Sequence, residues 1–109
     1  MENTEFAKIA EKTISLIADI IETEDKNCLI DVDFQGDILN LITDKGIFVI
    51  NKHSAAKEIW LSSPISGPYH FFYELGIWQT KTDIKLYEIL EQELQINFNN
   101  MRIDSNHHF

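Results

Sequence analysis

The sequence is poor in the features that would place it in a membrane, outside the cell or on nucleic acid. Its single cysteine, Cys28, cannot form an internal disulfide, which fits a reducing compartment. No apolar run approaches the ~18 residues of a membrane-spanning helix. The first residues, Met1-Glu2-Asn3-Thr4-Glu5, lack the positive start and apolar centre of a secretory signal, and they are too acidic for a mitochondrial transit peptide. We therefore expect a cytoplasmic protein.

Basic residues are also scarce. Lysines and arginines number 9 against 18 acidic residues, which gives a formal charge of −9. Nucleic-acid binding relies on cationic side chains to neutralise phosphates, so the composition argues against it. The charge suits metal cations or a basic protein surface instead. It is also unevenly placed, because residues 1–37 hold ten acids and three lysines, and a cationic partner is therefore expected there.

The pattern of apolar residues predicts a helix, a run of strands and a second helix. Residues 4–23 carry apolar side chains at three- and four-residue spacing, with Asn3 or Thr4 as the predicted cap. A second helix is predicted to begin at Thr82 or Asp83, and its helical spacing continues to Phe98. Between the helices, apolar and polar patterning predicts strands at residues 28–34, 38–43, 47–50, 58–62, 69–73 and 77–80.

This order of elements predicts an α+β fold in a single domain over residues 1–109. The hairpin-linked strands form an antiparallel sheet, and the N- and C-terminal helices pack on one of its faces. The result is a two-layer α/β sandwich whose opposite face meets water. The polar tail after about residue 100, which ends in His107-His108-Phe109, is expected to be poorly fixed.

The strand Glu58-Ile59-Trp60-Leu61-Ser62 carries the most informative single residue. Successive side chains of a strand face opposite ways, so Ile59 and Leu61 share one face and Trp60 lies on the other. Two interpretations follow. Trp60 is either an exposed partner-binding residue, since tryptophan is enriched in interface hot spots, or a core residue in a strand of shifted register. The pattern alone does not separate them.

The best chemical clue is a group of carboxylates near the end of the first helix. Asp19 and Glu22 are three residues apart and so share a helix face, while Asp31 and Asp33 share one face of the first strand. A short connection joins that helix to that strand. The candidate metal ligands are the six carboxylates that this connection can bring to one edge of the sandwich: Asp19, Glu22, Glu24, Asp25, Asp31 and Asp33.

Crowding these charges should cost stability, because acids at a helix C-terminus meet the negative end of the dipole at about 0.3–1 kcal/mol each. Folding gains nothing from that placement. A cationic ligand is one interpretation, and a solvated, solubilising surface is the other. Sites built only from oxygen suit hard divalent cations such as Mg²⁺, Ca²⁺ and Mn²⁺, and they do not single out iron.

Several segments of the chain resemble the frataxin family: Ile50-Asn51-Lys52, Ile59-Trp60-Leu61-Ser62-Ser63-Pro64 and Ser66-Gly67-Pro68. Two more, Tyr69-His70-Phe71 and Leu90-Glu91-Gln92, are similar to its bacterial (CyaY-type) branch. The resemblance covers nearly the whole chain. It implies the helix–sheet sandwich, an exposed Trp60, weakly bound iron (Fe²⁺ or Fe³⁺) and a role in iron–sulfur cluster assembly. It also implies a cysteine desulfurase and its scaffold protein as partners.

The chain departs from the family pattern in the acidic region and on the sheet. Four residues stand where bacterial relatives usually carry acids or similar polar groups: Ala18, Thr23, Asn27 and Leu29. Fewer carboxylates imply fewer or weaker iron sites. His53 and Glu58 stand where animal frataxins have glutamines, whereas Asn51 and Trp60 are retained.

Three functional hypotheses follow. The first is a bacterial, cytoplasmic accessory protein without catalytic residues, which binds iron weakly and modulates a desulfurase–scaffold complex. It would contact its partners through Asn51 and Trp60 and through Asp19, Glu22 and Asp25. The second is a ferroxidase or iron-storage protein that uses the same carboxylates. The third is an interaction module with no physiological metal.

The remaining reactive side chains have structural interpretations. Cys28 alternates with Ile30 and Val32 and is predicted to be a buried, inert thiol. Iron–sulfur clusters need several cysteines, so the chain is not expected to hold one. His53, in a predicted loop near Trp60, and His70 are predicted to be surface histidines.

Overall fold

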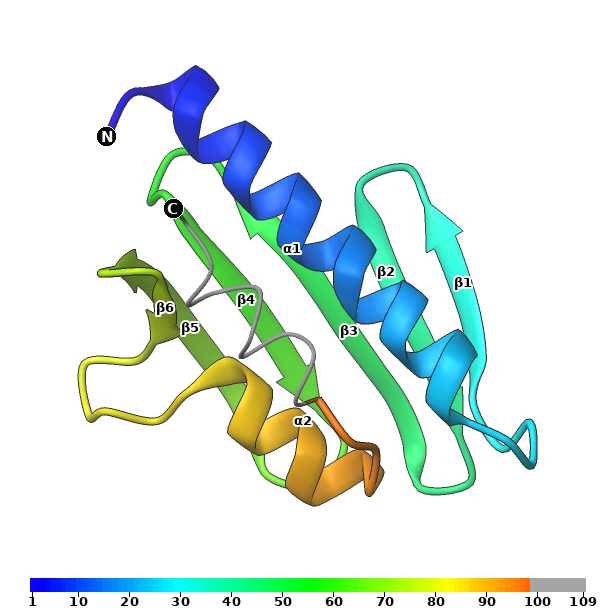
Figure 1. Ribbon diagram of the computed structural model, residues 1–109. Coiled ribbons are helices and arrows are strands. Elements are labelled where there is room, and N and C mark those ends of the chain that lie inside the picture. Colours follow the sequence, from blue (N-terminus) through cyan, green and yellow to red (C-terminus); the bar gives the residue numbers. More distant parts are fainter. Residues whose placement is uncertain (99–109) are drawn as a thin grey trace.

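The computed structural model describes residues 1–98, which form one antiparallel sheet with two helices on the same face (Figure 1). The six strands lie side by side in chain order, β1-β2-β3-β4-β5-β6. The predicted two-layer α+β sandwich is confirmed, and the polar tail lies outside the described residues. The elements are α1 (Asn3–Glu24), β1 (Asp31–Gln35), β2 (Ile38–Thr43), β3 (Gly46–His53), β4 (Glu58–Ser63), β5 (Gly67–Glu74), β6 (Ile77–Gln79) and α2 (Leu86–Leu94).

Helix α1 supplies one half of the core. Its apolar residues recur every three or four positions, and seven of them are buried: Phe6, Ala10, Ile14, Ile17, Ala18, Ile20 and Ile21. Fully burying one large apolar side chain contributes about 1.5–3 kcal/mol, so this stripe holds α1 on the sheet. The predicted caps are wrong. Asn3 and Thr4 already lie inside the helix, and Glu2 takes the N-cap position without a side-chain hydrogen bond.

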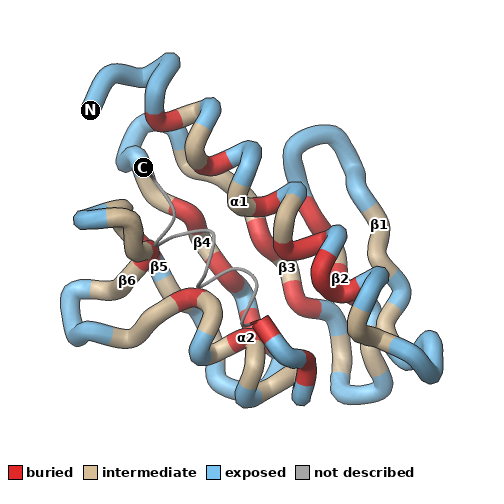
Figure 2. The backbone as a smooth tube through the Cα atoms, viewed as in Figure 1, coloured by how far each residue is buried: buried red, intermediate tan, exposed pale blue. Residues whose placement is uncertain are grey.

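The sheet supplies the other half of the core through every second residue of its strands. Directly opposed residues of an antiparallel pair share a face. The buried rows therefore join Leu41 to Phe48 and join Leu39 through Ile50 to Leu61. In Figure 2 the buried backbone positions of the central strands lie beneath the helices. No helix in residues 1–98 is long and apolar enough to cross a membrane.

Two predicted boundaries are wrong at positions with positive φ. Strand β1 begins at Asp31 instead of Cys28, because Cys28 has φ 53° and belongs to the connection from α1. Cys28 is therefore exposed, and the predicted buried thiol is wrong. Helix α2 ends at Leu94, since Gln95 takes a left-handed conformation with φ 56° that stops the helix. Phe98 is still fully buried, although it is not on the helix.

Helix α2 is attached to the turn between β4 and β5 through Glu93. The hydroxyl of Ser63, a buried residue, donates to Glu93 Oε1 at 2.6 Å, and the hydroxyl of Ser66 donates to Oε2. Ser63 Oγ also accepts the backbone N–H groups of Ile65 and Ser66, at 3.0 and 3.1 Å. The carboxylate of Glu93 therefore links α2 to the end of β4 and the β4–β5 turn. The helix begins at Leu86 after Lys85, so the predicted caps at Thr82 and Asp83 are also wrong.

Lys52 of β3 points toward the helices and forms an ion pair with Glu11 of α1, while its Nζ lies 3.8 Å from Asp37. The hydrogen bond to Glu11 raises the pKa of Lys52 above its ordinary value; burial opposes the shift, and the nearby Asp37 and Glu11 charges add to it. A raised pKa means that the folded protein holds the proton more tightly than the unfolded chain. The resulting stability is full below the unfolded pKa of about 10.4 and is lost as pH rises through the folded value.

Lys52→Met should therefore lower the free energy of unfolding at pH 7 by about 0.5–1 kcal/mol, as expected for a partly exposed ion pair. The difference from wild type should stay constant up to about pH 10 and shrink above it. Urea unfolding at several pH values measures both effects. Lys85→Met is the control, because Lys85 pairs at 3.4 Å with an exposed Asp83 only two residues away and should matter less. A Lys52 effect that persists unchanged at pH 11 would contradict the ion-pair explanation.

Candidate metal and partner surfaces

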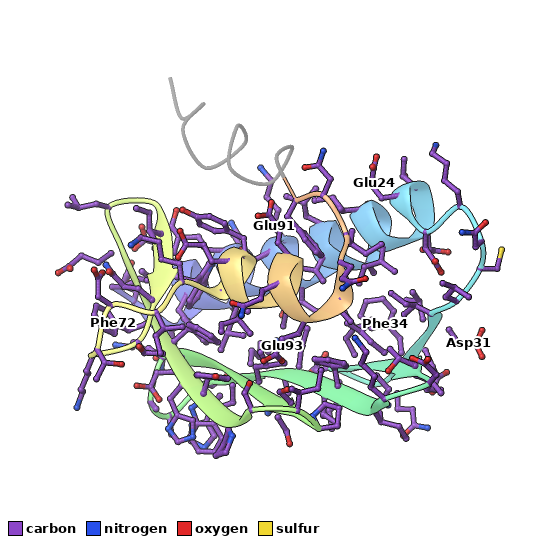
Figure 3. All side chains as sticks on the ribbon, turned by 90° about the horizontal axis from the view of Figure 1, so that it is seen from below. Glu24, Asp31, Phe34, Phe72, Glu91 and Glu93 are labelled. Atoms are coloured by element: carbon purple, nitrogen blue, oxygen red, sulfur yellow. The ribbon has the colours of Figure 1, made fainter. Side chains whose placement is uncertain are left out.

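The six candidate carboxylates lie in two layers of the molecule. Asp19 and Glu22 are exposed on α1, in the helix layer. Asp31 and Asp33 pair with Ile42 and Asn40, positions that alternate with the buried Leu41. The two aspartates therefore project from the sheet face that the helices leave uncovered. In Figure 3, Glu24 lies at the level of α1 and Asp31 at the edge of the sheet.

The six carboxylates therefore do not converge into a preformed metal site at this edge of the sandwich. Within residues 1–98 no three Asp, Glu, His or Cys side chains form a group that could hold a metal ion. The last turn of α1 nevertheless contains no basic residue to offset its carboxylates. The negative end of the helix dipole therefore meets uncompensated acids, which favours any cation that approaches this end of α1.

Asp25 has a structural role that the sequence pattern did not reveal. Its Oδ1 accepts the backbone N–H of Leu29 at 3.0 Å, and its Oδ2 accepts that of Ile30 at 2.8 Å. Both carboxylate oxygens are thus used to close the connection between α1 and β1. The predicted role of Asp25 as a ligand competes with these bonds, whereas Asp19 and Glu22 have no such commitment in the described part of the chain.

A groove of about 440 Å³ lies between the end of α1, the β2–β3 turn and the end of α2. Four carboxylates line it, but Asp25 is bonded to backbone and Glu93 to two serines. Lys26 and Lys45 also line the groove and offset part of its negative charge. The groove is therefore mixed in charge and does not supply a preformed metal site.

Trp60 lies on the uncovered face of the sheet, which is the first of the two interpretations that the strand pattern allowed. Its neighbours Ile59 and Leu61 are buried at 0% and 1% exposure, so the core interpretation of Trp60 is wrong. The indole is stacked between two imidazoles, with ring centroids 3.9 Å from His53 and 4.1 Å from His70. Its Nε1 donates to Glu58 Oε1 at 2.8 Å. A partner therefore meets the edge of a rigid three-ring stack and not an open indole face.

The amino-acid pattern did not lead us to predict this stack. His53 belongs to β3 and not to a loop, and His70 lies directly opposite Trp60 on β5. The available signal was the alternation of β5, which places His70 on the face opposite Phe71. On the other side of Trp60, the directly opposed residue is Asn51 of β3. The two predicted partner-binding residues of the sheet are therefore adjacent.

Comparisons with known proteins agree with this geometry. A family model described as a frataxin-like domain matches residues 1–100. The chain is 34% identical over 102 residues to the mitochondrial frataxin of Arabidopsis thaliana, covering 87% of this chain and 54% of the relative. It is 32% identical over 97 residues to the iron-sulfur cluster assembly protein CyaY of Vibrio vulnificus, covering 87% and 90%. The chain thus spans about half of the plant relative and nine-tenths of the bacterial one.

Solved structures show the same architecture. Frataxin from Psychromonas ingrahamii superimposes with a TM-score of 0.75 over 86% of this chain and 89% of that one, at 22% identity. Trimeric frataxin from the yeast Saccharomyces cerevisiae, in a ferrous complex, gives a TM-score of 0.66 at 29% identity over 87% and 84%. The bacterial structure supports the fold, and the yeast structure shows a similar chain that was studied with ferrous iron.

Asp25→Asn should lower the free energy of unfolding by about 1–2 kcal/mol, because an amide has only one oxygen to accept the two backbone N–H groups. Asp19→Asn is the matched control and should leave stability unchanged or raise it slightly, since it only relieves repulsion. Thermal unfolding measures the difference. Hydrogen exchange at Leu29 and Ile30 should accelerate in Asp25→Asn alone, and equal exchange in both variants would refute the structural role.

Trp60→Ala should lower the free energy of unfolding by about 1–2 kcal/mol, the loss expected from two ring stacks at a half-exposed site. Leu61→Ala, one residue away on the buried face, should cost about 2–5 kcal/mol. Chemical denaturation compares the two variants directly. Equal losses would mean that Trp60 is a core residue after all.

Proposed function

The chain belongs to the frataxin family, and from that membership we propose that it is a cytoplasmic accessory protein of iron–sulfur cluster assembly. It binds iron weakly and modulates a cysteine desulfurase–scaffold complex. The observation that carries the proposal is Trp60, a large aromatic side chain on the sheet face that neither α1 nor α2 covers. The core lies on the other face, so the contribution of Trp60 to folding is limited to its stacks with His53 and His70. Tryptophan is enriched among interface hot spots, so its place on this face favours a role in partner binding.

Iron is the proposed cargo of the acidic end of α1. The carboxylates of Asp19, Glu22 and Glu24 there are hard oxygen ligands, which also suit Ca²⁺, Mg²⁺ and Mn²⁺. Asp31 and Asp33 on β1 are further proposed ligands, and Asp25 is the weakest of the six because backbone N–H groups occupy its oxygens. Since the described residues hold no preformed three-ligand group, binding is weak, exchangeable and poorly selective. The ferrous complex of the yeast relative supports iron as the physiological choice.

The same acidic surface serves the partner. A cysteine desulfurase with basic side chains would be attracted to the end of α1, while its scaffold contacts the sheet near Asn51 and Trp60. Iron and the basic partner then compete for one set of carboxylates. The protein therefore acts as a modulator, changing how fast sulfur or iron reaches the scaffold without catalytic residues of its own.

The two rival functions predict different behaviour. A ferroxidase would consume oxygen at catalytic ratio when ferrous iron is added to the isolated protein. A metal-independent interaction module would keep its partner affinity in a chelator and gain no stability from cations. No contact among the described residues favours either of them over the modulator.

The double variant Asp19→Asn, Glu22→Gln removes two negative charges from the end of α1. Its affinity for ferrous iron should fall roughly tenfold for each replaced carboxylate that lies within about 6 Å of the ion. The same substitutions should also weaken desulfurase binding. Anaerobic calorimetric titration and residue-resolved NMR measure the first effect, and desulfurase pull-down the second. Millimolar Ca²⁺ or Mg²⁺ should raise the melting temperature of wild type more than that of the variant, by mass action.

The matched control changes two exposed acids at the opposite end of the helix, Glu2→Gln and Glu5→Gln. It removes the same charge from α1 but should leave iron affinity nearly intact. If both double variants lose iron binding equally, the effect is one of net charge, and the assignment to the end of α1 fails.

A further inference from the structure

Three isoleucines are exposed on the sheet face that carries Trp60. Ile38 and Ile42 of β2 are 40% and 39% exposed, and Ile47 of β3 is 51% exposed. All three alternate with fully buried neighbours, Leu39, Leu41 and Phe48. The core on the helix side is therefore complete without them, and their apolar surface meets water.

The strand register brings these side chains together. Ile42 lies directly opposite Ile47, and Ile38 lies opposite Asn51, which in turn lies opposite Trp60. Val49, half-buried, lies on the same face of β3 between Ile47 and Asn51. Opposed side chains on one face have Cβ atoms about 4.5–5.5 Å apart. Ile42, Ile47 and Val49 are therefore neighbours, Asn40 lies between Ile42 and Ile38, and Ile38 adjoins Asn51 and through it the Trp60 stack. We call Ile38, Ile42, Ile47 and Val49 the isoleucine patch.

The charged side chains around the isoleucine patch limit which kind of partner can bind it. Asp31 and Asp33 of β1 border it on one side, and Glu58 and Glu74 lie on the same sheet face farther across. Within the six strands the only lysine or arginine is Lys52, and it points to the other face, where it pairs with Glu11. On the uncovered face, β2 and β3 thus carry three isoleucines and Val49 among the neutral side chains of Asn40 and Asn51, and acids lie on either side of these two strands.

We propose that the isoleucine patch is the apolar centre of a docking surface for a protein partner with an apolar centre bordered by lysine or arginine. The inference rests on the proposed function and extends the partner surface from Asn51 and Trp60 across β2 and β3. A second copy of this chain does not fit. Both sides of such a contact would be acidic, in a chain of formal charge −9, and no lysine or arginine projects from the strands on this face to offset the repulsion.

The test uses the full chain and the purified desulfurase–scaffold complex as the probe. Ile42→Thr combined with Ile47→Thr keeps β-branched side chains in the strands but removes apolar surface, and it should weaken binding at least about fivefold. Leu75→Asn is the control. Leu75 is 93% exposed in the β5–β6 turn, and its φ of 53° suits asparagine, so exposed apolar surface is lost away from the patch and affinity should not change.

The outcomes separate this inference from the function on which it rests. If the isoleucine variant binds like wild type while Trp60→Ala binds weakly, the patch proposal is overturned and the proposed function stands. If wild type itself does not bind the complex, both are overturned. If the variant instead abolishes self-association measured by sedimentation, the occupant is a second copy and the proposal is wrong.

Two further measurements keep the test decisive. Melting temperatures confirm folding, and Ile47→Thr alone replaces the double variant if that variant unfolds. In metal-free buffer, Asp33→Asn should slow association and reduce its dependence on salt, because rim charges act mainly on the association rate with a basic partner. A salt dependence identical to that of wild type would exclude the basic border.

Discussion

The packing of α1 and α2 on one face of the sheet is the constraint from which the other properties follow. It divides every central strand into a row that is removed from water and a row that is not. Ile59 and Leu61 contribute to the first row, so Trp60 must belong to the second. The same division sends Lys52 toward Glu11 and sends Asp31 and Asp33 to the uncovered face. A shift of one residue in register would exchange these roles.

The acidic character of the chain has two structural meanings that its sequence does not distinguish. Some carboxylates stabilise the fold: Asp25 closes the α1–β1 connection, and Glu93 links α2 to the β4–β5 turn. Others, such as Asp19 and Glu22, are exposed at the end of a helix whose last turn has no basic residue. For the exposed acids at the end of α1, a bound cation relieves an unfavourable interaction with the helix dipole. Those acids are therefore the better candidates for weak iron binding.

The uncovered face combines features that suit recognition more than catalysis. It carries a stacked indole, an adjacent asparagine, exposed isoleucines and a border of acids, on strands that the core holds in place. Rigid side chains lose little conformational entropy when a partner binds, which favours a preformed surface of this kind. The diffuse carboxylates and the rigid sheet thus support the proposed modulator, in which a cation and a basic partner compete for the acids at the end of α1.

The sequence by itself determined the order of helices and strands and the two-layer architecture, because these depend on local periodicity of apolar residues. For Trp60 it left two interpretations, and the strand register decides between them. The sequence did not determine where β1 and α2 end, since Cys28 and Gln95 adopt left-handed conformations that residue type does not announce. Nor did it reveal the His53–Trp60–His70 stack, the separation of the acids into two layers or the isoleucine patch. Those features depend on which strands are neighbours and in what register, and only the tertiary structure decides that.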